Sequence, residues 1–551
     1  MRGVWMRIAA ALLSAMLLAL SFPLSLPPLK LPGLGAPLDI PLPGTLPGAG
    51  YAQLAWLAFI ALIPLLEAVR LSRRPAEAFI TGYVCGLAWL LLHWSWLGSF
   101  GLFAVIMLAV LYALPVGLFA MLAYYVIATG RVGLIVWLLP VIWTALEYLR
   151  SFGFWAFPWN LLGYSQVRNL PLIQIADSGG VYVVSFLIVL ASAALFAVLA
   201  PLPSARWRWG HGLLALAMLS FALAYGELRL TLSANPPPAA RHFSIALIQG
   251  GLDTFERWSE NRFLASLNQY LPPSQRELGA WASQQLRARV AQPGGIGPRQ
   301  EDSLLIVWPE SALARSMDPR RSNRVPPQLR GMLAAYPTAA LLLGAIGAPH
   351  DDKHQENGIM LLEQNGRLRW PYAKVRLVPY GEVVPFRQVA RFLQYPWGDE
   401  DVTEGRRLVP LNWRDYKLGL MVCFDNVFSP LCREQVRRGA EGLILVTNNS
   451  WYKLHSGIRQ HCDIDVLRAV EYGRPLARCS TTGWSHVIDP YGRVLESTSV
   501  ESAGAILREF DTASATTPYL IVGDLFAQLC LLIAVVACAA LLINGRSEGL
   551  L

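Results

Sequence analysis

The chain has 551 residues, of which 54% are apolar and only 15% are charged, and its formal net charge is +9. Soluble domains carry roughly 25% charged residues, so this composition excludes an ordinary soluble protein and indicates a membrane protein. In membrane proteins an excess of Lys and Arg usually lies in cytoplasmic loops. The basic balance therefore does not indicate a nucleic-acid partner, and we expect none.

Long apolar stretches fill the chain up to about residue 234 and return near its end. A helix that crosses a bilayer needs roughly 20 apolar residues. Eight stretches are of about this length, near residues 8–26, 51–69, 77–97, 102–128, 132–149, 174–199, 212–230 and 519–543. The sequence thus predicts a polytopic α-helical membrane domain of about eight spans. Seven of them fall in residues 1–234, and the last, with a cytoplasmic tail, falls in 516–551.

The short loops between these stretches carry Lys and Arg unequally. One side has nine, namely Arg2, Arg7, Arg70, Arg73, Arg74, Arg131, Arg206, Arg208 and Arg546, whereas the other side has three, namely Lys30, Arg150 and Arg168. Since basic loops remain in the cytoplasm, both termini are predicted to be cytoplasmic. The block at 235–515 then lies outside the cytoplasm.

This polar block contains short apolar runs of strand length. Runs such as "SLLIVWPES" (303–311) and "EGLILVTNNSW" (441–451) end in turn-forming residues. Helical patterns such as "RQHCDIDVLRAVEYG" (459–473) lie between the runs. Strands that alternate with helices predict a layered α/β or α+β domain.

Three groups suited to catalysis each follow one of the predicted strands. Glu310 follows "LLIVWP", Lys374 lies in "YAKVRLVPYGEVVPF", and Cys423 follows "LGLMV". A thiol is mostly protonated at neutral pH, so a nucleophilic cysteine needs a base or a cation nearby. Glu310 is suited to take the proton, and Lys374 is suited to stabilise the thiolate and then an oxyanion.

Each of the three also has a purely structural explanation. Glu310 could favour a helix N-terminus at "SALARSM", most lysines are solvated, and most free cysteines are core residues. A Cys–His pair is less favoured, because His455, His461 and His486 do not follow strands in this way. Taken singly, the structural explanations would prevail, and only the joint occurrence of the three groups with their flanking residues favours catalysis.

The flanking residues resemble the three motifs of the nitrilase, or carbon–nitrogen hydrolase, superfamily. The matching segments are "VWPES" with Glu310, "AKVRLVPYGEVVPF" with Lys374 and Glu382, and "GLMVCFD" with Cys423. "TNNSWY", "RAVEYGRPLARCSTTGWSHVIDPYGRV" and "ALIQGG" are similar to that superfamily as well. With eight spans around the block and the membrane stretch "GFWAFPWNLLGYSQ", the whole chain resembles the apolipoprotein N-acyltransferases.

This resemblance implies an αββα sandwich for the block and a role for each matched residue. Glu310 would be the general base, Lys374 the oxyanion stabiliser and Cys423 the nucleophile that forms a thioester. Glu382 would support the lysine and the reaction intermediate. Trp258 and Asn357 resemble substrate-contacting residues of the family, and Phe424 and Asp425 occupy the two positions after the nucleophile, which are also supporting or substrate-binding positions.

The chain also departs from the family pattern. The family usually has Tyr-Glu after the nucleophile, whereas this chain has Phe424, which lacks the hydroxyl, and Asp425, which is one methylene shorter. Both changes bear on the geometry of the acyl and head-group site. The Pro-rich segment at 21–50 is longer than the family leads us to expect.

The resemblance further implies the reaction, in which an acyl chain moves from a phospholipid through the cysteine thioester to the α-amino group of the diacylglyceryl-cysteine of an apolipoprotein. This is the last step of bacterial lipoprotein maturation. It needs no metal and no organic cofactor. We expect a monomer in the bacterial inner membrane, with its catalytic domain in the periplasm, and ping-pong kinetics.

The main alternative is a membrane-tethered amidase or nitrilase-type hydrolase of small amides. It would use the same three residues, so only the acceptor, water or amine, separates the two hypotheses. The eight spans favour a lipid substrate. A scaffold with a degenerate site is disfavoured because all three residues are present, and a transporter is disfavoured because the spans contain few charges.

Overall fold

The computed structural model describes residues 2–25, 53–153, 155–202, 207–233, 241–251, 260–290, 303–313, 325–350, 354–379, 381–383 and 402–547. The chain divides into two compact units. The helical unit comprises Met1–Asn235, Tyr452–Glu471 and Thr517–Leu551, and the sheet unit comprises Pro236–Trp451 and Tyr472–Thr516. Most of the Pro-rich segment lies outside the described residues.

Six described helices of the helical unit are long and apolar enough to cross a membrane. They are α1 (Arg2–Ser21), α3 (Pro75–His93), α4 (Leu102–Ala128), α5 (Val132–Leu149), α7 (Ala176–Leu199) and α8 (Arg208–Leu232). A seventh helix, α15 (Leu525–Ser547), has a shorter apolar part at Leu525–Leu541. The predicted polytopic membrane domain is confirmed.

Residues 51–69 and 519–543, each predicted as one span, are divided between separate helical elements. Residues 51–69 correspond in part to a 3₁₀ turn, η1 (Ala55–Phe59), and the short helix α2 (Ile63–Arg70). A proline in the first turn of α2 starts a new helix there, because proline lacks the N–H that a continuous helix would need. Near the C-terminus, Gly523 at φ 61° separates α14 (Pro518–Val522) from α15, since a left-handed glycine ends a helix.

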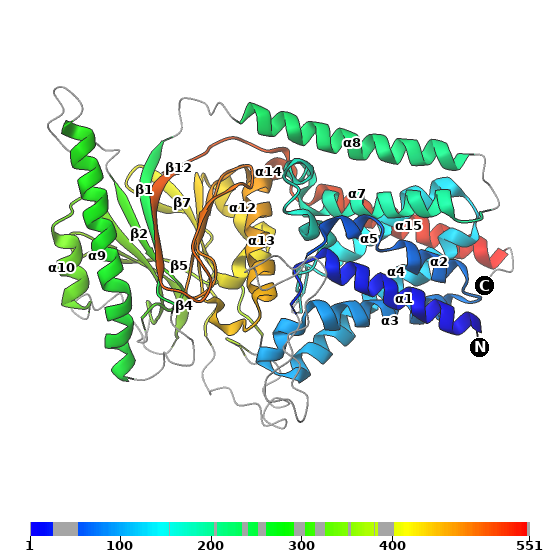
Figure 1. Cartoon of the computed structure of the whole chain (residues 1–551), viewed down its shortest axis with the longest axis horizontal. Helices are drawn as coiled ribbons and strands as arrows, with labels where there is room; N and C mark the ends of the chain where they lie inside the picture. The colour runs from blue at the N-terminus through cyan, green and yellow to red at the C-terminus, as the bar shows by residue number, and fades with distance from the viewer. Residues whose placement is uncertain are drawn as a thin grey trace. The chain divides into compact units, whose positions relative to one another are not determined.

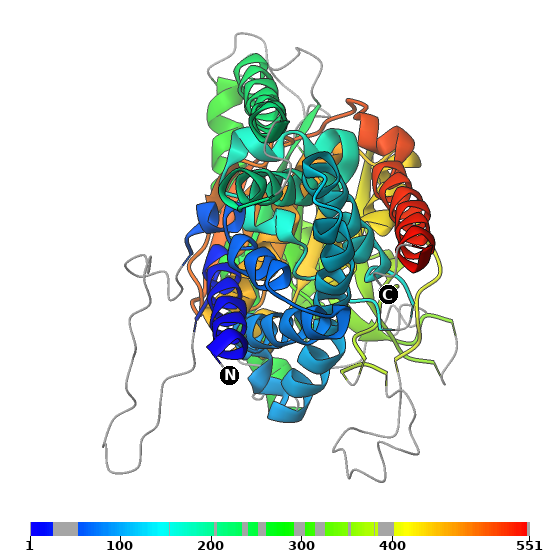
Figure 2. The same ribbon diagram turned by 90° about the vertical axis from the view of Figure 1, so that its right-hand side faces the viewer.

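The remaining described elements of the helical unit are the short η2 (Ser95–Phe100), η3 (Leu162–Gln166) and α6 (Leu170–Ile173), and the 18-residue helix α13 (His455–Tyr472), nearly all of which belongs to this unit. The start of α1 and the end of α15 lie at the same end of this unit (Figure 1), and Figure 2 views the unit from that end.

The sheet unit contains two six-stranded sheets of matching design. The first has the order β12-β1-β2-β3-β4-β5, with β1 (His242–Gln249), β2 (Leu304–Trp308), β3 (Ala339–Gly347), β4 (Glu356–Glu363), β5 (Leu368–Ala373) and β12 (Gly504–Asp511). The second has the order β11-β10-β9-β8-β7-β6, with β6 (Leu411–Trp413), β7 (Tyr416–Val422), β8 (Gly442–Thr447), β9 (Leu476–Ser480), β10 (His486–Ile488) and β11 (Val494–Ser497). In each sheet three adjacent strands, β1–β3 or β7–β9, are parallel and the others are antiparallel.

The two sheets pack face to face with helices outside them. Alternate strand residues, such as Leu305 and Val307 of β2 and Leu420 and Val422 of β7, share one buried core between the sheets. The intervening residues of the first sheet pack against α9 (Glu260–Val290) and α10 (Pro327–Ala334), which cover its outer face in Figure 1. On the second sheet, the Gln435 side chain of α12 (Ser429–Arg437) forms two hydrogen bonds with the backbone of Leu420 on β7. The predicted nitrilase-like αββα sandwich is confirmed.

Helix α13 connects β8 to β9 along the chain, yet nearly all of it groups with the membrane helices. The buried Gln460 Oε1 accepts hydrogen bonds from the indole N–H groups of Trp96 and Trp159, at 2.9 and 3.0 Å. Near the other end of α13, the Glu471 carboxylate accepts the backbone N–H of Val181 at 3.0 Å. The compact units are therefore not contiguous segments of the chain.

Candidate active site

The parallel strands of the first sheet place Glu310 at their carboxyl ends. Glu310 follows β2 by two residues and is 6% exposed. On the neighbouring strand β3, a Cβ atom added to Gly344 would lie 2.4 Å from the Glu310 Cα. Only glycine at this position leaves room for the Glu310 backbone, so the local sequence of β3 helps to fix the carboxylate.

Both carboxylate oxygens of Glu310 are engaged within the sheet unit. Oε1 accepts a hydrogen bond from Asn357 Nδ2 at 2.8 Å and lies 3.4 Å from the Lys374 Nζ. Oε2 accepts the backbone N–H of Asn448, which follows β8, at 2.8 Å. These contacts come from both sheets and fix the orientation of a carboxylate that still lies beside a cationic group.

Lys374 follows β5 and is held mainly by Glu382. Its Nζ lies 2.8 Å from Glu382 Oε2, which is shorter than its 3.4 Å separation from Glu310. Burial by itself lowers the pKa of Lys374, but the charges of Glu310 and Glu382 outweigh it and raise the pKa well above its usual range. The side chain is therefore a buried ammonium at neutral pH.

Asn357, on β4, joins the two glutamates through its side-chain amide. Nδ2 donates to Glu310 Oε1 at 2.8 Å and to Glu382 Oε1 at 2.6 Å. The backbone carbonyl of Asn357 also accepts the N–H of Lys374 at 2.7 Å. The sequence-based expectation of a substrate-binding role is untested, but these contacts show that Asn357 orders the charged groups themselves.

Cys423 follows β7 on the second sheet and begins the 3₁₀ turn η7 (Cys423–Val427). Its φ is 48°, a left-handed value that is uncommon for residues other than glycine and costs roughly 1–3 kcal/mol when imposed by the surroundings. Burial, and then the charge of Glu310, raise the pKa of Cys423 to about 12, although Lys374 acts in the opposite direction. The resting group is thus a neutral thiol that needs a base at the moment of reaction.

Asp425 holds the turn after the cysteine to the segment after the lysine. Its Oδ1 accepts the backbone N–H groups of Val375 and Arg376 at 3.2 and 2.8 Å. Its Oδ2 accepts the Tyr372 hydroxyl at 2.9 Å and the Val422 N–H at 3.1 Å. With four donors and no exposed surface, Asp425 supports the site through the protein itself, and we infer a supporting role in preference to substrate contact.

Phe424 and Trp258 complete the set predicted from the sequence. The Phe424 side chain packs edge to face on Phe428, with ring centroids 5.2 Å apart, and the Arg376 guanidinium lies 4.7 Å from the Phe428 ring. An aromatic ring without a hydroxyl suits this contact. Trp258 lies outside the described residues.

Sequence patterns did not identify every group that contacts the site. Asn448 contributes only its backbone N–H to Glu310, so its side-chain type carries no signal for this contact. Tyr372, by contrast, is on β5 and lies two residues before Lys374, which directly follows that strand. In a strand, residues two apart face the same side, so its hydroxyl could have been suspected as a partner of the same cluster.

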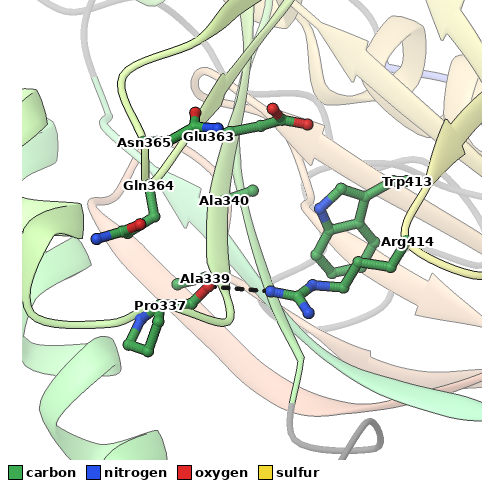
Figure 3. Close-up of a pocket in the computed structure, with 8 residues that line it drawn as sticks. All are labelled: Pro337, Ala339, Ala340, Glu363, Gln364, Asn365, Trp413 and Arg414. Carbon is green, nitrogen blue, oxygen red and sulfur yellow. Dashed lines mark hydrogen bonds between the residues drawn. The ribbon is translucent and has the colours of Figure 1, made fainter.

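A hollow elsewhere in the sheet unit is separate from these residues (Figure 3). It has a volume of about 180 Å³ and is lined by Pro337, Ala339, Ala340, Glu363, Gln364, Asn365, Trp413 and Arg414. Arg414 donates to the Pro337 carbonyl across it, at 3.1 Å. Ala339 begins β3 and Arg414 precedes β7, so the hollow lies at the strand starts, whereas Glu310 and Cys423 follow strand ends.

Metal-ion ligation is not evident in the part of the chain that the structure describes, where no group of three or more His, Cys, Asp and Glu side chains could hold an ion. All seven cysteines are described, and all are free thiols.

Two protein families match the chain in succession. Residues 44–194 match the apolipoprotein N-acyltransferase N-terminal domain, and residues 250–517 match the carbon–nitrogen hydrolases. Among solved structures, an amidase from Nesterenkonia sp. is similar with 20% sequence identity, covering 54% of this chain and 98% of the amidase, at a TM-score of 0.35.

Curated relatives match over both halves of the chain. The apolipoprotein N-acyltransferase of Geobacter metallireducens is 33% identical over 519 residues, covering 90% of this chain and 92% of the relative. Those of Rickettsia bellii and Chlorobaculum tepidum are each 28% identical, covering 82% and 94% of this chain and 87% and 96% of the relatives. Because these matches include the membrane helices, they favour acyl transfer over the hydrolase alternative. The chain belongs to the apolipoprotein N-acyltransferase family, and it is a membrane-embedded acyltransferase.

Proposed function

We propose that this enzyme takes an acyl chain from a phospholipid, holds it as a thioester on Cys423, and delivers it to the α-amino group of the diacylglyceryl-cysteine of an apolipoprotein. The observation that carries the proposal is the buried cluster of Glu310, Lys374 and Glu382 around a strained, buried cysteine. In a chain with long apolar helices, such a cluster is suited to substrates that reside in a bilayer.

In the first half-reaction the Cys423 sulfur attacks the carbonyl carbon of the phospholipid ester. The pKa of about 12 means that the thiol does not ionise beforehand, so Glu310 takes its proton during the attack. The carbonyl oxygen becomes an oxyanion, which the Lys374 ammonium stabilises. The ester C–O bond then breaks, the leaving glycerol oxygen takes the proton from Glu310, and lysophospholipid departs.

In the second half-reaction the neutral α-amino group of the lipoprotein attacks the thioester carbonyl carbon. Glu310 takes a proton from the attacking nitrogen, and Lys374 stabilises the second oxyanion. The C–S bond breaks, an amide forms, and the Cys423 sulfur recovers the proton from Glu310. The two substrates use one site in turn, which predicts ping-pong kinetics.

Glu382 and Asn357 act on these steps through Lys374 and Glu310. Glu382 holds the ammonium at 2.8 Å, so Lys374 stays protonated without transferring its proton to Glu310. Asn357 donates to both glutamates, which lowers the repulsion between two carboxylates that share one cation. Glu310 thereby remains an available base.

We further propose that the chain lies in the bacterial inner membrane as a monomer, with its termini in the cytoplasm and its catalytic domain in the periplasm. The nine-to-three distribution of basic residues among the short loops supports this orientation. The common end of α1 and α15 in the helical unit supports it too. The proposed domain boundaries are those predicted from the sequence. Residues 1–234 and 516–551 form the membrane segments, and residues 235–515 form the catalytic domain.

Trapping the acyl-enzyme would test this function. The purified full chain and its Cys423→Ala variant are incubated in detergent with phospholipid and no acceptor, and intact and peptide masses are then measured. We expect an acyl-chain mass on the Cys423 peptide that is absent from the variant and is discharged as an amide on a diacylated lipopeptide. A folded protein that gains no adduct would exclude phospholipid as the donor.

A further inference from the structure

Thr447 is the last residue of β8 and lies beside the proposed nucleophile. Strand β8 is parallel to β7, and its Val446 pairs with Val422, so Thr447 and Cys423 follow equivalent positions of adjacent strands. Neighbouring strands are about 4.8 Å apart, a distance that a side chain spans. The register therefore places the Thr447 side chain within reach of the Cys423 sulfur.

Hydrogen bonds hold the backbone of Thr447 on both sides. Its carbonyl oxygen accepts the backbone N–H of Thr481 at 3.1 Å and the Thr481 hydroxyl at 3.3 Å. The next residue, Asn448, donates its backbone N–H to Glu310 Oε2 at 2.8 Å. The same strand end thus sets the position of the Thr447 side chain and orients the proposed general base.

The Thr447 hydroxyl is buried and unpaired in the resting enzyme. The residue has no exposed surface, and its Oγ1 makes no hydrogen bond of normal geometry with any described residue. Most buried polar atoms in proteins are paired, because an unpaired one loses its bonds to water without replacement. Valine has nearly the same shape and would avoid this cost, so packing alone does not account for a threonine at this position.

The hydroxyl acts on the Cys423 sulfur. Burial is the main cause of the raised pKa of Cys423, about 12, and the Thr447 hydroxyl, together with Lys374, acts in the opposite direction. A hydroxyl lowers the pKa of a thiol by donating to the thiolate, which accepts a hydrogen bond much better than the neutral thiol does. The Thr447 donor is therefore matched to the ionised sulfur and is little used by the resting thiol.

We propose that the Thr447 hydroxyl is a further catalytic group, which donates a hydrogen bond to the Cys423 sulfur whenever that sulfur carries negative charge. This role rests on the proposed thioester chemistry and adds a group to it. As the sulfur attacks the ester carbonyl, its proton passes to Glu310, and the hydroxyl keeps its own proton while it stabilises the charge that develops on the sulfur. When the amine expels the sulfur from the thioester, the sulfur leaves with the C–S electron pair, and the same hydrogen bond stabilises the thiolate until it recovers the proton from Glu310.

Alkylation of Cys423 tests this contact without any lipid substrate. The purified full chain and its Thr447→Val and Thr447→Ser variants are treated with iodoacetamide between pH 8 and 9.5, and the Cys423 peptide is followed by mass spectrometry. Below the pKa of the thiol, the rate is proportional to the thiolate fraction. We expect the valine variant to react about tenfold more slowly, because its thiolate lacks a hydrogen bond, and the serine variant to react within about twofold of the wild type. Equal rates in the valine variant and the wild type would overturn the proposal.

Thermal stability separates this role from a structural one. Removing an unpaired buried hydroxyl leaves the thermal midpoint unchanged or raises it, whereas losing a structural hydrogen bond lowers it. Thr512→Val is the matched control, because that buried hydroxyl donates to the Arg241 carbonyl at 2.8 Å, next to the start of β1. The control should have a lower midpoint and an unchanged alkylation rate, and the same result in Thr447→Val would show that Thr447 is structural. Should the valine variant of Thr447 not fold, Thr447→Ala, which also lacks the hydroxyl, takes its place.

Thioester formation by the same variants connects the contact with catalysis. With phospholipid and no acceptor, Thr447→Val should form the acyl-enzyme on Cys423 about tenfold more slowly than the wild type, and Thr447→Ser should recover most of the rate. An undiminished rate in the valine variant would refute the catalytic role. A wild-type chain that gains no acyl group, but whose alkylation still depends on the Thr447 hydroxyl, would refute the proposed acyl donor and leave the hydrogen bond to the sulfur standing.

Discussion

Asn357 and Lys374 contact the same two carboxylates, Asn357 through a neutral amide and Lys374 through a cationic ammonium group. The Asn357 amide donates to Glu310 and Glu382 at 2.8 and 2.6 Å, and the Lys374 ammonium lies 3.4 and 2.8 Å from the same pair. The shorter ammonium contact is to Glu382, which leaves Glu310 less tightly held by the lysine. Glu310 and Glu382 have the same side chain, but this difference in distance gives them different proposed roles: Glu382 holds the lysine, and Glu310 acts as the base.

Replacing Asn357 by leucine should therefore slow acyl-enzyme formation. The variant keeps similar volume but removes both N–H donors, and hydrogen bonds to charged groups contribute about 1.5–3 kcal/mol each. Loss of one such bond in the transition state corresponds to roughly a tenfold to hundredfold slower rate. The rate of thioester formation with excess phospholipid measures this effect. Asn365→Leu, on the exposed turn after β4, serves as control, and equal rates in the two variants would contradict the positioning role.

Glu310→Gln should have opposite effects on alkylation and on transfer. Burial and the charge of Glu310 raise the pKa of Cys423, so removing that charge lowers the pKa and increases the thiolate fraction at pH 8. Alkylation of Cys423 by iodoacetamide should then become faster than in the wild type. Acyl transfer should fall at least about a hundredfold, because the general base is lost. Slower alkylation in the variant would show that Glu310 does not control the thiol.

Asp425→Asn should change how stability depends on pH. Burial raises the pKa of Asp425 to about 6, above the ordinary value of about 3.9. The folded chain therefore binds this proton more readily than the unfolded chain, and its contribution makes stability fall as pH rises from about 4 to 6. The asparagine variant lacks this contribution, which is on the order of 3 kcal/mol. Thermal midpoints in detergent at pH 4.5 and 6.5 measure it, and an identical pH dependence in both proteins would refute the assignment.

Gly344→Ala should disturb Glu310 through the backbone. The added Cβ would lie 2.4 Å from the Glu310 Cα, which requires the strand end to shift. Overpacking of this kind costs about 1–3 kcal/mol, so we expect a lower thermal midpoint and a large loss of acylation. Gly331→Ala on α10, where the Cβ meets nothing within 4 Å, should instead leave activity intact and raise stability by about 0.5–1 kcal/mol. A Gly344 variant that keeps full acylation would show that the strand end can shift at no cost to catalysis.

The sequence predicted those parts of the site that depend on strand ends. Glu310 and Cys423 each follow a parallel strand, and a run of apolar residues ending in a reactive group is visible in the sequence. The part played by Asn357 was not visible, because it depends on the pairing of β4 with β3 and β5, a long-range register. Residues 51–69 were predicted as one span on hydropathy alone, which does not register that a proline can begin a new helix.

The position of α13 also determines the order in which the helical unit can be completed. Gln460, which accepts the indole N–H of Trp96, is 364 residues later in the chain. At a ribosomal rate of about 5–20 residues per second, Trp96 is synthesised roughly 20 to 70 s before its partner. During that interval the indole groups of Trp96 and Trp159 need water, lipid head groups or an insertion factor as temporary partners. The interior of the helical unit is therefore completed only after most of the sheet unit has been translated.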